Sequence, residues 1–106
     1  HHVAARVEEY DKQNGTDFLF TLETYLMYNK SLMLASERLF IHRSTLTYRL
    51  KCIEKIAPMD LENPCERLHI LLSCIALRIL AKSEAGVARS ASNNDATKKF
   101  ERYNDK

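Results

Sequence analysis

Two helical patterns of apolar residues lie only four residues apart in the middle of the sequence, and this spacing constrains the fold more than any other feature. The first pattern, in residues 32–40, is expected to turn three residues inward: Leu34, Ala35 and Leu39. The second, in residues 44–57, gathers four residues within about 40° of one direction on a helical wheel: Leu46, Leu50, Ile53 and Ala57. Residues 40–43, from the last residue of the first pattern to the residue before the second, contain neither glycine nor proline. A turn of about four residues between two short helices is typical of a helix-turn-helix.

The rest of the sequence predicts a small all-α domain of about five helices that contains this helix-turn-helix. The chain has 106 residues with only two glycines and two prolines, which leaves few turn residues for an all-β fold. Further helices are expected in residues 3–13, 17–28 and 64–83. The last of these is apolar over most of its circumference, so we expect it to be the central core helix.

Capping residues mark the ends of the expected helices. Gly15 is expected to end the first helix in the left-handed conformation, and Pro58 to end the fourth. Asn63 is expected as the N-cap of the last helix, followed by Pro64 and Glu66 at its first and third positions. The caps expected for the other helices are Thr16 or Asp17, Ser31, and Ser44.

The chain is expected to divide into one folded domain and a tail. Residues 1–83 form the expected helix-turn-helix domain, with its core in residues 16–82. Residues 84–106 are rich in Ala, Ser, Asn, Asp and Lys, and this composition predicts a flexible polar tail. His1 and His2 resemble the remnant of a purification tag and take no part in the expected site.

The charges are unevenly distributed, although the formal net charge is only +2. Residues 38–55 contain five Lys or Arg and one acid, whereas residues 1–29 contain two Lys or Arg and five acids. A basic centre beside an acidic start favours binding to a polyanion. The same pattern also fits a helix face that is merely solvated, and charge alone does not separate the two.

Polar, aromatic and basic residues share the side of residues 44–57 that lies opposite the apolar one: Ser44, Tyr48, Lys51 and Lys55, with Thr47 beside them. A recognition helix needs such a face, because its N-terminal part reaches base edges in the major groove. The residues expected to read bases are Arg43, Ser44, Thr45, Thr47 and Tyr48. The residues expected to hold phosphates are His42, Arg49, Lys51, Lys55, Arg38 and Lys30.

Two of these residues have equally good structural interpretations. The ring of His42 can instead close the turn by bonding to the backbone. Arg49 lies near the edge of the buried side, where it can pair with an acid such as Glu23 or Glu37.

A long motif in the same region resembles a known family. The run LFIHRSTLTYRL at residues 39–50, followed by Ile53 and Glu54, resembles the C-terminal helix-turn-helix domain of the PucR/CdaR family of regulators, whose signature reads approximately L-F-I/V-H-R-N-T-L-x-Y-R-L-x-x-I-E. The resemblance covers roughly residues 10–82. Its other parts are Tyr10-Asp11, Thr21-Leu22, Tyr25-Leu26, Asp60-Leu61, Asn63-Pro64 and Arg67-Leu68.

The resemblance implies a bacterial transcription regulator that binds double-stranded DNA through this domain, with a sensory region N-terminal to it. A cytoplasmic location is expected from the odd number of cysteines without paired spacing and from the lack of a signal peptide. One short helix reads only a few base pairs, so we expect two copies on a two-fold-related site, a homodimer formed here or through other regions. The sequence departs from the family pattern at two places. Ser44 stands where the family usually has Asn, and Pro58-Met59 replaces a glycine-containing loop.

Another class of function remains open at this point: a helical module that binds a partner protein and no DNA. An enzyme is not expected, because the chain has no glycine-rich phosphate loop, no clustered carboxylates and no Cys–His pair with an orienting group. No cofactor is expected. The cysteines, Cys52, Cys65 and Cys74, lack the paired spacing of a zinc site and are interpreted as reduced thiols on helices. No apolar run is long enough to span a bilayer.

Overall fold

The computed structural model describes the backbone of residues 2–92 and the side chains of residues 2–83. Within that span the chain forms five α-helices and no strand, which confirms the predicted all-α class. The helices are α1 (His2–Asn14), α2 (Phe18–Met27), α3 (Leu32–Leu39), α4 (Arg43–Ile56) and α5 (Pro64–Ser92).

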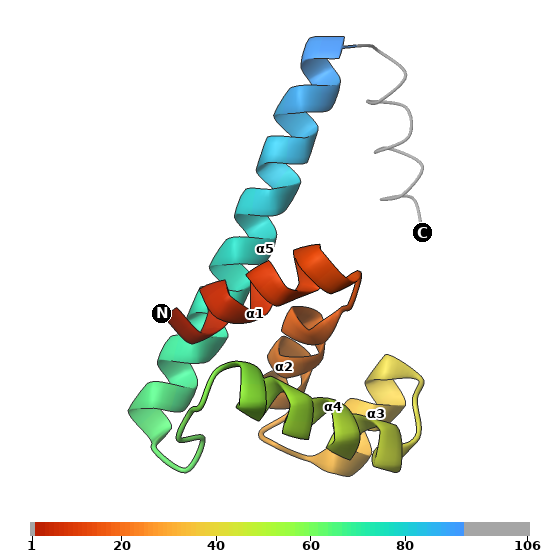
Figure 1. Ribbon diagram of the computed structural model, residues 1–106, viewed down its shortest axis with the longest axis vertical. Helices are drawn as coiled ribbons and strands as arrows, with labels where there is room; N and C mark the ends of the chain where they lie inside the picture. The colour runs from red at the N-terminus through yellow and green to blue at the C-terminus, as the bar shows by residue number, and fades with distance from the viewer. Residues whose placement is uncertain (1, 93–106) are drawn as a thin grey trace.

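The central helix of the fold is α2, which contacts each of the other four. The short helices α3 and α4 pack together on one part of α2, while α5 runs along the other side of the molecule against α1 and α2 (Figure 1). The prediction that the last helix is central was therefore wrong. α2 has that position because it buries residues on several sides, including Thr21, Leu22 and Leu26.

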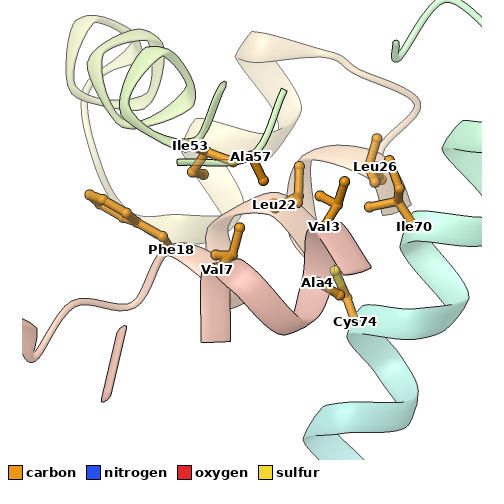
Figure 2. Packing of buried hydrophobic residues seen from close by; sticks show 10 residues of the cluster. All are labelled: Val3, Ala4, Val7, Phe18, Leu22, Leu26, Ile53, Ala57, Ile70 and Cys74. Atoms are coloured by element: carbon orange, nitrogen blue, oxygen red, sulfur yellow. The ribbon is translucent and has the colours of Figure 1, made fainter. Parts of the chain in front are cut away.

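The hydrophobic core lies where α1, α2, α4 and α5 meet (Figure 2). Its buried members are Val3, Ala4, Val7, Phe18, Leu22, Leu26, Ile53, Ala57, Ile70 and Cys74. Burial raises the pKa of the Cys74 thiol to about 12, so this side chain stays neutral and serves as a small apolar residue. The other two thiols are more accessible, with Cys52 half-buried and Cys65 exposed.

Only one side of α5 belongs to this core. Ile70 and Cys74 are buried, but the residues that are more than half exposed on the same helix include Leu68, Leu72, Ile79 and Leu80. The domain is too small to surround the helix, since α5 contacts α1 and α2 alone in the described part of the chain. The helix also continues past its expected end near Lys82 and Ser83, as far as Ser92. The rest of the expected tail, residues 93–106, lies outside the described residues.

The start of α2 differs from the expectation. Asp17 occupies the N-cap position, but neither its side chain nor that of Thr16 caps the helix. The carboxylate of Asp11 in α1 does so instead, because it accepts hydrogen bonds from the backbone N–H of Phe18 and Leu19, both at 2.9 Å. The hydroxyl of Thr16 donates to the same carboxylate. This cap therefore joins α1 to α2 across the connecting turn.

Three other predicted helix ends are confirmed. Gly15 follows α1 with a φ of 65°. The hydroxyl of Ser31 accepts a hydrogen bond from the Leu34 backbone at 3.1 Å and caps α3. The side-chain oxygen of Asn63 accepts from the backbone N–H of Cys65 and Glu66 at the start of α5.

Candidate nucleic-acid interface

The turn between α3 and α4 reverses the chain without a glycine. Phe40 ends α3 in the left-handed conformation, with φ 57° and ψ 42°. The backbone N–H of Ile41 donates to the Ser36 carbonyl at 3.0 Å, and that of Phe40 to the Glu37 carbonyl at 3.2 Å. These bonds satisfy carbonyls at the end of α3, as in a Schellman motif. The side chain of Phe40 is 89% exposed. The sequence did not predict this exposure, and no pattern of apolar residues indicates it.

The first turn of α4 is held by His42 and not by Ser44 as expected. Nδ1 of His42 accepts a hydrogen bond from the Ser44 backbone N–H at 3.1 Å and lies 2.8 Å from the Ser44 hydroxyl. The helix begins one residue earlier than expected, at Arg43, so Ser44 lies inside its first turn. The structural interpretation of His42, closing the turn by bonding to the backbone, is confirmed.

The buried side of α4 agrees with the wheel. Leu46, Ile53 and the following Ala57 are all buried, and Leu50 is half-buried. The helix packs against α1, α2 and α3, which fixes its orientation in the domain.

The inward side of α3 is narrower than expected. Ala35 is buried and Leu39 half-buried, but Leu34 lies about 100° around the helix from Ala35 and is 44% exposed, so its expected inward position was wrong.

The opposite side of α4 is open to solvent over its whole length. The exposed residues on and beside it are Arg43, Ser44, Thr45, Tyr48, Lys51, Glu54 and Lys55. Thr47 is half-buried, and its hydroxyl donates to the Arg43 carbonyl at 3.0 Å. Tyr48 is 66% exposed although it is aromatic. We call the set Ser44, Tyr48, Lys51 and Lys55 the α4 face.

The phenol of Tyr48 lies one turn before Cys52 on α4. Hydrogen bonding to the Cys52 sulfur, and the negative charge of its thiolate, raise the pKa of Tyr48 above its usual value near 10. The phenol is neutral near pH 7, so its hydroxyl is available both as a donor and as an acceptor.

The other expected phosphate ligands are less uniform. Arg38 is exposed at the end of α3. Arg49 donates to the hydroxyl of Thr21 at 3.3 Å, so it is linked to α2 by a neutral partner and not by the expected acid. Lys30 pairs with Glu62 at 3.0 Å. Glu23, which had been considered as the partner of Arg49, pairs with Arg78 of α5.

No binding site of another kind emerges from the described residues. A hollow of about 130 Å³ lies between α2, α4 and the loop before α5, which is small for a cofactor pocket. No group of three or more His, Cys, Asp or Glu side chains in the described part of the chain is arranged to hold a metal ion. The described helices include none with the length and hydropathy needed to cross a membrane.

Comparisons with known proteins point to one family. The family model described as the PucR C-terminal helix-turn-helix domain matches residues 18–76. The proline-responsive transcriptional activator PutR of Bacillus subtilis is 37% identical over 68 residues, which are 64% of this chain. The DNA-binding transcriptional activator AdeR of the same species is also 37% identical over 68 residues, again 64% of the chain. An uncharacterized protein of Haemophilus influenzae is 36% identical over 55 residues, or 52% of the chain.

The matched region is a small part of these relatives. It makes up 16% of PutR and of AdeR, and 15% of the Haemophilus protein. No solved structure matches the chain significantly.

Proposed function

Because this chain belongs to the family of PucR C-terminal helix-turn-helix domains, it is a DNA-binding output domain of a transcription regulator, and we propose that α4 is the helix that it places in the major groove. The observation that carries this proposal is the division of α4 into two sides. Leu46 and Ile53 are buried against the domain, while the α4 face is exposed along the entire helix.

The first two turns of α4 are proposed to read bases. The residues that take this role are Arg43, Ser44, Thr45, Thr47 and Tyr48. Arg43 is exposed at the helix start, where a guanidinium can pair with O6 and N7 of guanine. His42 supports the reading end indirectly, because it fixes the first turn through its bond to Ser44.

Phosphates are proposed to lie along both ends of α4. Lys51 and Lys55 are exposed further along the helix, and Arg38 is exposed at the end of α3. Arg49, Lys30 and His42 remain in the proposed phosphate set, each with a protein partner that it would share with DNA or exchange for it. Every phosphate that is neutralised releases counterions, so affinity is expected to fall steeply with salt.

We further propose that two copies bind together. One α4 face covers few base pairs, and two related faces on half-sites about one helical turn apart give the specificity that a regulator needs. The whole regulator would act in the bacterial cytoplasm, with its sensory part outside this chain.

The proposal is tested by selecting bound sequences from random duplexes and measuring fluorescence anisotropy of the selected duplex across a salt series. For Lys51→Ala we expect weaker binding and a slope of log affinity against log salt that is smaller by about one. For Arg43→Ala we expect a loss of discrimination worth about 1–3 kcal/mol at one base position.

A matched control is Lys12→Ala. Lys12 is an exposed lysine on the side of α1 opposite its buried residues, where it pairs with Glu8. Its removal should leave the salt slope unchanged. Failure of the wild-type chain to bind any duplex at low salt, or an equal effect of Lys12→Ala and Lys51→Ala, would contradict the proposal and favour a protein partner for α4.

A further inference from the structure

One side of α5 carries a row of aliphatic side chains that no other described helix covers. Four of them follow each other at spacings of four, three and four residues: Leu68, Leu72, Ile75 and Ile79. We call these four residues the α5 stripe. Leu68, Leu72 and Ile79 are 56%, 55% and 56% exposed, and Ile75 is half-buried.

The α5 stripe lies on the side of the helix directly opposite the core. At 100° per residue, the stripe is centred about 170° from Ile70. Ile70 and Cys74 are buried toward α1 and α2, so the stripe points away from the domain. Figure 1 shows α5 at the margin of the molecule, with much of its length extending beyond the other helices.

The spacing of the stripe is that of a helix that packs against another helix. Apolar residues at alternating intervals of three and four form the seam of a two-helix contact. Such a continuous exposed row is unusual in a monomer and marks an interaction surface. The chemistry required of the partner is therefore an apolar helical seam of the same length.

We propose that the α5 stripe packs against the α5 stripe of a second copy of this chain, with the two helices antiparallel. A two-fold axis passing between positions 73 and 74 places Leu68 opposite Ile79 of the second copy and Leu72 opposite its Ile75. The stripe is thus complementary to itself, as the interface of a two-fold dimer must be.

Lys82 favours the antiparallel arrangement. Most other charges near the two ends of the helix have partners within the chain: Arg78 pairs with Glu23, Glu62 pairs with Lys30, and Glu66 accepts from the Asp60 backbone N–H. Lys82 is exposed one turn beyond Ile79, about 50° from the centre of the stripe. A parallel pair would place it beside Lys82 of the second copy, and like charges across a seam are unfavourable, whereas the antiparallel axis places it opposite Cys65.

The contact is expected to be weak in the absence of DNA. Stable interfaces bury at least about 1,000 Å² in total, and four aliphatic side chains from each copy supply less than that. Two copies held on neighbouring half-sites meet at a high effective concentration, and there the contact becomes cooperative. This last step rests on the proposed DNA-binding function, whereas the self-association itself does not.

The test is sedimentation equilibrium of the whole 106-residue chain between about 10 μM and about 1 mM. We expect the wild-type chain to form dimers toward the upper end of this range, and Leu72→Lys to weaken dimerisation at least about tenfold because it puts a charge in the seam. Leu80→Lys is the matched control. Leu80 is a leucine on the same helix and is 56% exposed, but it lies about 110° from the centre of the stripe, so its substitution should leave the dimer intact.

The orientation is tested by mixing two variants. Leu72→Lys and Ile75→Glu are each expected to be monomeric, and their mixture is expected to dimerise about as tightly as the wild-type chain, because the antiparallel axis places Lys at position 72 of one copy opposite Glu at position 75 of the other. A parallel pair would leave each of these charges opposite an aliphatic side chain, so its mixture should remain much weaker than the wild-type dimer. Circular dichroism checks that each variant is folded. If Leu72→Lys unfolds, Ile79→Lys replaces it and is mixed with Leu68→Glu, because the axis places position 79 opposite position 68.

The proposal is overturned if the wild-type chain remains monomeric over the whole concentration range. That result would indicate that another segment or another protein covers the α5 stripe. It is also overturned if Leu80→Lys weakens the dimer as much as Leu72→Lys, or if the mixture stays monomeric. Binding of Leu72→Lys to a duplex with a single half-site distinguishes failure of the proposed dimer from failure of the proposed DNA-binding function. Retained half-site binding supports the DNA-binding function whatever the outcome for the dimer, and a dimer that binds no duplex contradicts only that function.

Discussion

His42 has a structural role that decides how α4 begins. Its Nδ1 accepts the Ser44 backbone N–H at 3.1 Å and so satisfies one of the N–H groups that a helix start leaves without an internal partner. Histidine is not among the favoured N-cap residues, which is why the sequence alone pointed to Ser44. The ring thus connects the turn to the end of the helix that is proposed to read bases.

This role predicts the effect of two substitutions at one position. His42→Ala removes the acceptor and should lower the free energy of unfolding by about 1 kcal/mol, whereas His42→Asn restores a good N-cap and should lower it by much less. Urea denaturation followed by circular dichroism measures both. Equal stability of the Ala and Asn variants would show that the hydrogen bond to Ser44 contributes nothing.

At the scale of single residues, a cap was predictable where a favoured capping residue bonds to its near neighbours in the chain. His42 is not a favoured capping residue, and Asp11 does not bond to near neighbours. The caps at Ser31 and Asn63 involve neighbours two or three residues away, and both were predictable. The cap of α2 comes from Asp11, seven residues before the Phe18 N–H that it accepts, and depends on how α1 folds back. No local pattern contains that information.

Among the elements, α2 and α5 are joined by an ion pair at the edge of the core. Nε of Arg78 donates to Oε1 of Glu23 at 2.9 Å. The Glu23 side chain is only 8% exposed, while that of Arg78 is 42% exposed. The pair therefore satisfies a carboxylate that has little contact with water.

Removing Arg78 alone should lower the free energy of unfolding more than removing the charges of both Arg78 and Glu23. Arg78→Leu leaves the Glu23 carboxylate buried without its counter-charge, and we expect it to lower the free energy of unfolding by about 2 kcal/mol. The double variant Glu23→Gln with Arg78→Leu should recover most of that loss, because a neutral amide needs no counter-charge. Thermal and urea unfolding of both variants decide the matter. A double variant as unstable as Arg78→Leu would indicate that the packing of the arginine matters and not its charge.

The elements also show which sequence patterns are informative. The wheel of residues 44–57 has a clear polar side, and both sides of α4 were predictable from it. α5 has no such polar side, and a helix that is apolar all round was interpreted as central. The same pattern results when one side of a helix packs on the domain and the other stays exposed to solvent. In α5, Ile70 lies on the buried side and Leu72 on the exposed side. Only the tertiary structure distinguishes these cases.

At the scale of the whole molecule, two surfaces face different directions. The α4 face lies on the part of the domain formed by α3 and α4, and the α5 stripe lies on a helix that contacts neither of them. A domain with this arrangement can bind DNA through one surface while a second copy occupies the other. The family resemblance indicated the first surface from the sequence, whereas the second became visible only with the exposed side of α5.

The central claim is that the exposed side of α4 is the surface that meets DNA. The most direct measurement is an NMR titration of the isotope-labelled chain with the selected duplex, which follows every backbone amide. We expect the largest shifts at Arg43–Ile56 and in the preceding turn, with the amides of α1 on the side of Lys12 unchanged. Large shifts confined to other helices, with Tyr48, Lys51 and Lys55 unaffected, would contradict the claim.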